Sequence, residues 1–350
     1  METAVHAMAP GPLPVGHPPI RPPRIGVVLL NLGTPDATDY WSMRRYLSEF
    51  LSDRRVIDYP AWLWQPLLQL VILSVRPGSK GKEYAAIWNR ELDESPLKTV
   101  TRAQAQKLGR LMEQRHPEIM VDWAMRYGNP STASVMERLV AAGCRKLLLL
   151  ALYPQYAAPT TATAYDKAFE ALGRMRWQPM VRTVGPWHDH PAYVELLAAS
   201  IRAHYATLDF EPDLLVMSYH GVPKRYLLEG DPYHCHCQKT SRLVGQALGW
   251  PKDRLMVCFQ SRFGREEWLQ PYLDETLAAL PGRGVKKLAV VSPAFVTDCL
   301  ETLEEIAVAG KESFMHAGGE RFTYIPCLND TDDHVAFLAE IARQELQGWV

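Results

Sequence analysis

One histidine stands where a strand-like run ends. Residues 216–223 (VMSYHGVP) are apolar up to His220, and a Gly-x-Pro turn follows at once. Buried parallel strands have this composition, and open α/β sheets bind ligands at the carboxyl ends of such strands. The imidazole would then face a crevice, where it could take a proton or bind a metal near neutral pH. The alternative is a strand-end histidine that is hydrogen-bonded to its own turn.

A row of carboxylates follows a second apolar run. Residues 288–293 resemble another short strand and lead into an acidic helical segment that contains Asp298, Glu301 and Glu305. Their i, i+3, i+7 spacing predicts that the three carboxylates share one helix face. Such a row could pass protons or a hydrated metal ion. Carboxylate and neutral imidazole both accept protons and both ligate divalent metal ions, so the residue types do not separate base from ligand. The alternative is a solvated acidic face near a helix N-terminus.

Composition narrows the class of protein. A chain of 350 residues exceeds the usual single core, so we expect two domains. Hydrophobic residues make up 47% and charged residues 22%, which is ordinary for a soluble globular enzyme. The net charge of −1, without long runs of either sign, gives no reason to expect nucleic acid. Six scattered cysteines suit a reducing compartment better than a disulfide framework.

Two segments depart from the pattern of a folded core. Residues 1–23 are rich in proline, without the features of a secretory signal, and we expect a disordered leader. Residues 61–73 (AWLWQPLLQLVIL) are apolar, yet too short for a transmembrane helix, and Arg76, Lys80 and Lys82 follow them. We call residues 61–73 the lip. It is either a buried core helix or an exposed surface that touches a membrane or a large apolar ligand.

Apolar runs alternate with helical patterns along the rest of the chain. This alternation predicts parallel sheets built from βαβ units. The expected strands are residues 25–32, 120–126, 146–152, 180–184, 214–220, 255–260, 287–292 and 322–327. The expected helices include residues 99–115, 131–142, 192–205, 238–247 and 266–280.

The chain also repeats itself weakly. Three short motifs recur in the same order: LGTP at 32 and HGVP at 220, RYG at 126 and RFG at 262, GCRKL at 143 and GVKKL at 284. Their offsets of 188, 136 and 141 residues indicate two related halves, with about fifty extra residues in the first half around the lip. His220 is matched by Leu32, and Glu301 by Ala162. We therefore infer a cleft between the halves, with an apolar wall opposite an imidazole–carboxylate wall.

These residues resemble the ferrochelatase family over nearly the whole chain. The resemblance rests on residues 29–36 (LLNLGTPD), 125–128 (MRYG), 152–156 (LYPQY), 218–223 (SYHGVP), 230–233 (GDPY) and 295–303 (FVTDCLETL). It implies an α/β fold with two Rossmann-like domains, each a parallel sheet flanked by helices, and the active-site cleft between them. The expected domains are residues 24–185, with an insertion at about 36–98, and residues 186–350.

The resemblance implies insertion of Fe²⁺ into protoporphyrin IX, with iron and porphyrin as substrates. His220 and Glu301 match the catalytic and metal-binding residues, and Asp298 and Glu305 the path for protons or metal. The positions implied for porphyrin binding are Leu32, Arg76, Tyr84, Ser95, Arg126, Tyr127, Tyr153 and Phe295. The alternatives are another tetrapyrrole chelatase, of the coproporphyrin or sirohydrochlorin type, and a non-catalytic two-lobed protein that binds haem or metal.

Two departures from the family pattern bear on cofactors. Cys299 stands where many members have histidine, so a third imidazole is not expected. The animal-type 2Fe–2S cluster is not expected either, because Ala158 replaces its internal cysteine and the sequence ends at Val350. We expect no permanently bound cofactor and a cytoplasmic protein, with peripheral contact to the inner membrane face through Trp62 and Trp64 of the lip.

The run HCHC at residues 234–237 invites a second metal reading. Cysteine and histidine alternate there, but zinc sites usually use C-x₂₋₄-C spacing and a partner pair. We expect a polar loop, with a metal or iron–sulfur site as the alternative.

Overall fold

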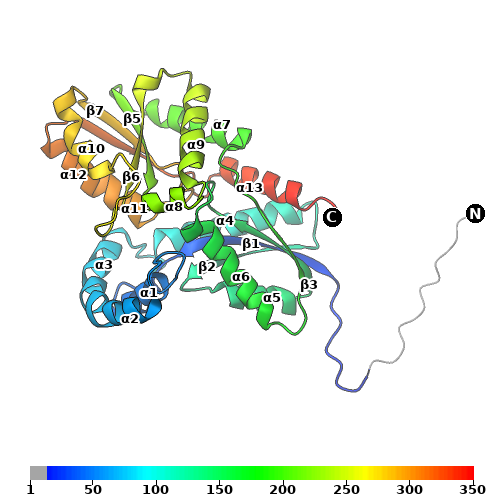
Figure 1. The fold of residues 1–350 in the computed structure, drawn as a ribbon. Helices are drawn as coiled ribbons and strands as arrows, with labels where there is room; N and C mark the ends of the chain where they lie inside the picture. The colour runs from blue at the N-terminus through cyan, green and yellow to red at the C-terminus, as the bar shows by residue number, and fades with distance from the viewer. Residues whose placement is uncertain (1–13) are drawn as a thin grey trace, which may run out of the picture.

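Two four-stranded parallel sheets form the centre of the molecule in a computed structural model that describes residues 14–350 (Figure 1). The first sheet has the order β2-β1-β3-β4 and the second the order β6-β5-β7-β8. The strands of the first sheet are β1 (Arg24–Gly33), β2 (Ile119–Tyr127), β3 (Cys144–Ala151) and β4 (Met180–Thr183). The second sheet consists of β5 (Leu214–His220), β6 (Leu255–Gln260), β7 (Lys287–Val291) and β8 (Arg321–Ile325).

The two sheets have one topology, and the repeat read from the sequence is confirmed. β1 and β5 occupy the same central position, each between the second and third strand of its own half. Leu32 and His220 therefore end equivalent strands. All eight expected strands are present, because strands buried on both faces are continuous apolar runs in the sequence.

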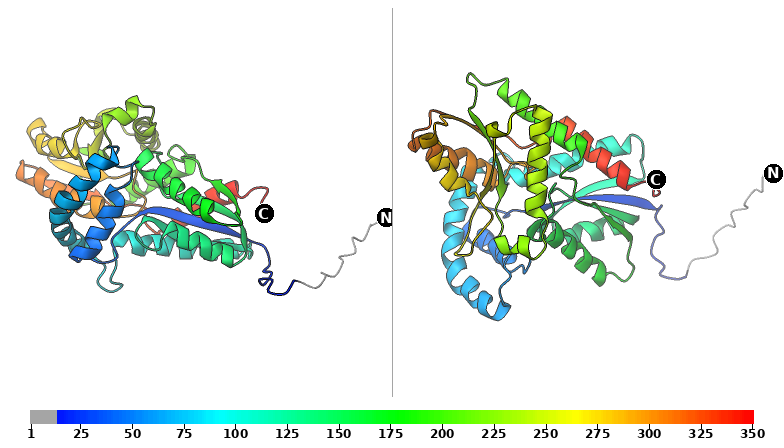
Figure 2. Two further views of the ribbon diagram at one scale, coloured as in Figure 1. Left: turned by 60° about the horizontal axis from the view of Figure 1, so that its bottom comes forward. Right: turned by 45° about the horizontal axis from the view of Figure 1, so that its top comes forward.

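Helices cover both faces of each sheet (Figures 1 and 2). On the first sheet, α5 and α6 pack on one face and α4 on the other. On the second, α7 and α9 face α10 and α12 across the sheet. Their bounds are α4 (Pro96–Glu113), α5 (Thr132–Ala141), α6 (Thr163–Arg174), α7 (Pro191–Tyr205), α8 (Lys224–Leu228), α9 (Tyr233–Leu248), α10 (Leu273–Ala279), α11 (Leu300–Leu303), α12 (Lys311–His316) and α13 (Asp332–Glu345). Short π-helical segments are Ala158–Ala162 and Glu305–Gly310, and 3₁₀ turns are Lys252–Arg254 and Pro281–Arg283.

The insertion of the first half forms a helical group at the edge of the molecule, coloured blue to cyan in Figure 1. It consists of α1 (Tyr40–Leu51), α2 (Ala61–Leu67), a π-helical segment (Leu68–Ile72) and α3 (Leu73–Ile87). α3 contacts α11 of the second half. The insertion thus reaches across to the half that carries His220 and Glu301, beyond the carboxyl end of β1.

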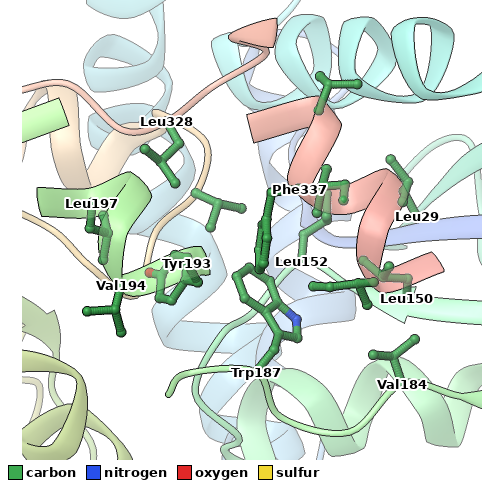
Figure 3. Packing of buried hydrophobic residues seen from close by; sticks show 14 of the residues in the cluster. Leu29, Leu150, Leu152, Val184, Trp187, Tyr193, Val194, Leu197, Leu328 and Phe337 are labelled. Carbon is green, nitrogen blue, oxygen red and sulfur yellow. The ribbon is translucent and has the colours of Figure 1, made fainter. Parts of the chain in front are cut away.

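The largest core cluster joins the two halves. Figure 3 shows Trp187 and Phe337 between Leu29 and Leu150 of the first sheet and Leu197 of α7. Phe337 belongs to α13, which packs against α4 and β3 although it follows the second sheet in sequence. A continuous apolar core holds the halves in one arrangement, and the predicted boundary at residue 185 stays a prediction.

The expected helix over residues 266–280 is only partly correct. α10 begins at Leu273, and residues 261–272 form a loop. Pro271 has no N–H to donate within a helix, and its carbonyl instead accepts from the Phe259 amide at 2.8 Å. The Leu269 amide donates to the Val222 carbonyl at 3.0 Å. The first part of this loop, residues 261–268, contributes to a wall of the cavity.

Two further expectations concern the termini and membranes. Residues 1–13 of the expected leader lie outside the described residues, whereas residues 14–23 are exposed and form no helix or strand. Across residues 14–350, no helix is both long enough and apolar enough to cross a bilayer.

Candidate active site

A cavity of about 550 Å³ lies where the carboxyl ends of the two sheets meet. Its walls come from the ends of β1, β3 and β5, from the insertion, and from the segments that follow β6 and β7. This volume lies within the range of small-molecule sites, roughly 300–1,000 Å³. Leu32, Trp64, Phe295 and Trp268 contribute apolar surface to its lining. The cleft between the halves is therefore where the repeat placed it.

His220 lies at this cavity as the last residue of β5. Its Nδ1 is 2.6 Å from the Gly221 carbonyl oxygen. A carbonyl only accepts, so Nδ1 carries a proton, and in the neutral tautomer the lone pair would lie on Nε2. Within residues 14–350, Nε2 makes no hydrogen bond. The bond to its own turn is therefore present, and the role of His220 as a base or ligand stays a prediction.

Two of the three predicted carboxylates reach the cavity. Glu301 lies in the short helix α11 and Glu305 at the start of the π-helical segment. Glu305 is held: its carboxylate accepts from the Ser261 amide at 2.9 Å and the Ser261 hydroxyl at 2.6 Å. Glu301 is fixed through its backbone carbonyl, which accepts from the Gln260 side chain at 2.9 Å. Its carboxylate is therefore placed by the main chain.

Asp298 points elsewhere, and the prediction of one shared helix face is wrong. It precedes Cys299, the N-cap of α11, and does not line the cavity. Its carboxylate accepts from Thr302 at 2.9 Å, Tyr324 at 2.8 Å and Asn329 at 2.7 Å. Helical spacing does not apply across a cap, because the N-cap residue has non-helical dihedral angles. Asp298 fixes the start of the helix that carries Glu301.

Aromatic side chains from the insertion face this acidic wall. Tyr46 and Tyr84 are buried and line the cavity. Burial raises the pKa of Tyr84 far above its usual value, and the negative charge of Glu301 raises it further. Both effects also raise the pKa of the Cys299 thiol, which keeps it protonated and a weak metal ligand. Tyr84 and Cys299 are therefore neutral at physiological pH.

Five of the eight residues expected to bind porphyrin line the cavity: Leu32, Arg76, Tyr84, Ser95 and Phe295. Ser95 also caps α4 by accepting from the Lys98 amide at 3.2 Å. Tyr153 lines it too, and its hydroxyl is buried with no hydrogen-bond partner among residues 14–350. A buried hydroxyl without a partner is costly, so Tyr153 offers a ligand a polar contact.

Arg126 and Tyr127 are not in the cavity lining. Arg126 and Thr163 donate to the Asp53 carboxylate, and the Tyr127 hydroxyl joins them at 2.8 Å. Burial opposes ionisation of Asp53, but these bonds outweigh it and the pKa of Asp53 lies below its usual value. Both residues thus anchor the segment between α1 and α2, and a strand-end motif alone did not reveal that.

The lip divides into two faces. Trp62 is 79% exposed, and Leu70 of the lip and Val75 just after it are also exposed. Trp64 is 8% exposed, lines the cavity and donates from Nε1 to the Leu51 carbonyl at 2.7 Å. The expectation of two exposed tryptophans is therefore right for Trp62 and wrong for Trp64. Both residues lie in α2, and a separation of two residues places them on nearly opposite sides of an α-helix.

Residues 234–237 belong to α9 and not to a polar loop. Cys237 is buried, while the His236 ring stacks on His188 with centroids 3.7 Å apart. Among residues 14–350, no three or more His, Cys, Asp or Glu side chains are grouped so that they could hold a metal ion. Nothing in this part of the chain therefore favours a resident metal at residues 234–237.

Several lining residues escaped the sequence analysis. Tyr46 and Trp268 line the cavity without belonging to any motif used there, and Phe263 was used only as part of the repeat motif RFG. Tyr46 had a signal, since α1 buries one apolar face. Trp268 lies in the part of the loop that was expected to be helical, so no periodicity could place it.

The geometry agrees with what the chain is similar to. The model of the family described as ferrochelatase matches residues 24–346. The chain belongs to the ferrochelatase family. It is 58% identical over 339 residues to the ferrochelatase of Rhodobacter capsulatus, covering 96% of this chain and 97% of the relative. It is also 58% identical over 338 residues to the ferrochelatase of Allorhizobium ampelinum, covering 97% and 98%. The chain is thus a metal-chelating enzyme of the lyase class.

Solved structures show the same fold at low identity. SirB from Bacillus subtilis with Fe³⁺ superimposes with a TM-score of 0.52 at 12% identity, covering 72% of this chain and 91% of that one. The sirohydrochlorin chelatase SirB from B. subtilis subspecies spizizenii, in complex with cobalt, gives 0.51 at 10%, covering 92% and 95%. The two-domain α/β fold predicted from the family resemblance is confirmed.

Proposed function

We propose that this ferrochelatase inserts Fe²⁺ into protoporphyrin IX and releases two protons. The observation that carries the proposal is the free Nε2 of His220 at a cavity that Glu301 also lines, together with apolar and aromatic side chains of the first half. A flat apolar macrocycle matches such walls, and its metallation needs acceptors for two pyrrole protons. Iron is a substrate here, and we propose that no permanently bound cofactor takes part.

His220 and Glu301 are the residues proposed to act on the substrates. Nε2 of His220 takes a pyrrole proton or ligates the incoming iron, and both are functions of a neutral imidazole. Glu301 supplies a carboxylate beside Tyr84 and Cys299, which stay protonated. For every Fe²⁺ bound by the four ring nitrogens, two N–H bonds break, so charge and protons balance when both protons leave.

The other predicted residues divide into binding and positioning roles. Leu32, Tyr84, Tyr153 and Phe295 would contact the macrocycle, because they line the cavity. Asp298 holds the start of the helix that carries Glu301, and Glu305 holds Ser261, the residue that follows β6. Arg126 and Tyr127 anchor the insertion through Asp53. For Asp298, Glu305, Arg126 and Tyr127 we propose these positioning roles in place of direct contact with iron or porphyrin.

The exposed face of the lip is proposed to rest on a membrane surface. Trp62, Leu70 and Val75 point away from the core, and each is more than 70% exposed. The opposite face of the same helices lines the cavity with Trp64. An apolar substrate could then move between bilayer and cavity with little exposure to water, because burial of apolar surface favours both places.

A metallation assay tests the proposed function. Purified protein is mixed with Fe²⁺ or Zn²⁺ and, in separate reactions, protoporphyrin IX, coproporphyrin or sirohydrochlorin, and loss of the free macrocycle is followed by fluorescence. We expect turnover of protoporphyrin. Faster turnover of a more carboxylated macrocycle would assign the site to another tetrapyrrole chelatase, and binding without turnover of any would indicate a binding protein.

A further inference from the structure

The run of histidine and cysteine at residues 234–237 contains one ring that contacts the other half of the molecule. His236 lies in the first turn of α9, and its Nδ1 is 3.2 Å from the Tyr156 amide nitrogen. An amide N–H only donates, so Nδ1 accepts and the neutral ring carries its proton on Nε2. This hydrogen bond can therefore form only while Nδ1 of His236 is unprotonated.

Tyr156 lies in a segment that forms part of the cavity wall. Residues 152–157, which we call the β3 loop, follow β3 of the first half and bring Tyr153 and Gln155 into the cavity lining. Gln155 is buried, and its Oε1, like the Tyr153 hydroxyl, has no hydrogen-bond partner among residues 14–350. Contacts of both groups with a bound ligand therefore depend on the position of the β3 loop.

Two further hydrogen bonds join this part of the first half to the second half. Gln155 Nε2 donates to Thr240 Oγ1 at 3.0 Å, and the Ala158 amide donates to the Asp231 carboxylate at 2.7 Å. Hydroxyls and carboxylates ordinarily keep accepting near neutral pH, whereas imidazole ordinarily takes up a proton at about pH 6.5. The bond to His236 is therefore the tie among these three that a proton can remove near neutral pH.

A second imidazole lies flat against the first. His188, in the segment that joins the two halves, stacks on His236 with centroids 3.7 Å apart and planes 12° from parallel. His188 is buried, and its Nδ1 has no hydrogen-bond partner among residues 14–350. Burial and the neighbouring His236 lower the pKa of His188 to about 4. His188 therefore stays neutral while the more exposed His236 takes up a proton.

Three charged side chains act on the ring of His236. Asp231 precedes α9, Asp189 lies in the segment that joins the halves, and Lys239 of α9 pairs with Asp189 at 2.5 Å. Burial is the largest effect and lowers the pKa of His236 below its ordinary value, although the two carboxylates raise it. The ring is therefore neutral at pH 7, and protonation in acid would place an N–H against the N–H of Tyr156.

We propose that His236 is a positioning residue of the metallation site, whose neutral ring holds the β3 loop in place and whose protonation releases it. The inference rests on the proposed function, because the β3 loop is a wall of the cavity that is proposed to bind protoporphyrin. Porphyrin affinity should then fall in acid through His236, although this residue does not line the cavity. One hydrogen bond changes an equilibrium constant by roughly two- to tenfold, so the effect is measurable.

Two substitutions separate the hydrogen bond from the proton. His236→Asn keeps an acceptor oxygen as many bonds from the backbone as Nδ1 but does not titrate, whereas His236→Leu has no acceptor at any pH. His234→Asn is the matched control, because the His234 ring of the same run stacks on Phe259 of β6, with centroids 6.0 Å apart. Kd for metal-free protoporphyrin is measured by quenching of tryptophan fluorescence at pH 7.5 and pH 5. Each variant is compared with the unmodified protein at the same pH, which cancels any titration of the ligand.

At pH 7.5, His236→Leu should raise Kd about three- to fivefold, within the range for one hydrogen bond, and His236→Asn should stay within about twofold of the unmodified protein. At pH 5, the unmodified protein should lose affinity and approach His236→Leu, while His236→Asn should bind about three- to fivefold more tightly than the unmodified protein. His234→Asn should follow the unmodified protein at both pH values.

Two results would overturn the inference. One is a ratio of Kd between His236→Asn and the unmodified protein that does not change with pH, and this comparison holds whether or not His236→Leu folds. The other is an equal Kd for His236→Leu and the unmodified protein at pH 7.5. Porphyrin binding without zinc insertion in the unmodified protein would instead contradict the proposed function and leave the Kd comparison valid.

Discussion

The two tryptophans of the lip should respond in opposite ways to the same substitution. Trp64→Ser removes an indole that is 8% exposed and hydrogen-bonded to Leu51. Truncating a large buried aromatic costs about 3–5 kcal/mol, so the melting temperature should fall by several degrees. Trp62→Ser removes a side chain that is 79% exposed and leaves no cavity. Its melting temperature should stay within about 1 °C, since surface changes usually lie within ±0.5 kcal/mol.

Membrane binding, in contrast to thermal stability, should change strongly in Trp62→Ser. A buried indole covers about 150–250 Å², and roughly four-fifths of it is available here. At ~25 cal/mol per Å² its full insertion would contribute up to about 3–5 kcal/mol. We expect Trp62→Ser to weaken liposome binding by tenfold or more, which corresponds to about 1.4 kcal/mol or more.

Liposome co-sedimentation and a melting curve on one preparation of each variant supply both readouts. Trp177→Ser is the matched control, because Trp177 is 46% exposed but lies just before β4, at the amino-terminal edge of the first sheet. It should change neither readout by much. Unchanged liposome binding in Trp62→Ser, or equal loss in Trp177→Ser, would refute the membrane role of the lip.

Three further predictions concern the acidic wall and the two halves. Glu301→Gln keeps size but removes charge and proton capacity, and metallation should fall by at least ~10²-fold, whereas a loss below tenfold would make Glu301 a helix-face residue only. Asp53→Asn should lower the free energy of unfolding by about 3 kcal/mol in urea at pH 7, because it removes the nearest carboxylate of the buried Arg126 and leaves only Glu49, at 3.9 Å. Since the pKa of Asp53 is lowered, this stabilisation is present above the unfolded value of about 4 and is lost as pH falls through the folded value. Equal stability of variant and parent at pH 7 would contradict the role. Burial and the neighbouring His236 lower the pKa of His188 to about 4. As pH falls from about 6.5 towards 4, this histidine is protonated in the unfolded chain before the folded one, so the free energy of unfolding should decline. His188→Phe should flatten that decline in urea titrations at pH 7 and pH 5, and an unchanged slope would exclude His188 as its source.

The strands and the two-half design could be predicted because each rests on a local pattern. A strand buried on both faces is a continuous apolar run, and the bounds of β5 and β6 match the predicted ranges at both ends. The similar turn sequences after β1 and β5 indicated the repeat. His220 and Glu301 were found by the same route, as polar residues where apolar runs end.

The remaining features depend on contacts between segments distant in sequence. Asp298 turns towards Tyr324 and Asn329 of the β8 region, so its spacing from Glu301 carried no information about its partners. Arg126 meets Asp53 across 73 residues of chain. Trp62 and Trp64 differ for a simpler reason: they are two residues apart in α2, which places them on nearly opposite sides of the helix, and Trp64 packs with residues of α1. Helical periodicity could have separated the two tryptophans, but not the partners of Asp298 and Arg126.

We propose that His220, with Nε2 free at the cavity, metallates protoporphyrin together with Glu301. The decisive experiment compares the initial rates at which His220→Ala and the unmodified protein deplete protoporphyrin fluorescence in the presence of ferrous iron under anaerobic conditions. Porphyrin binding and melting temperature are measured on the same samples. We expect His220→Ala to fold and bind porphyrin but not to metallate it. Turnover near that of the unmodified protein would remove His220 from the mechanism.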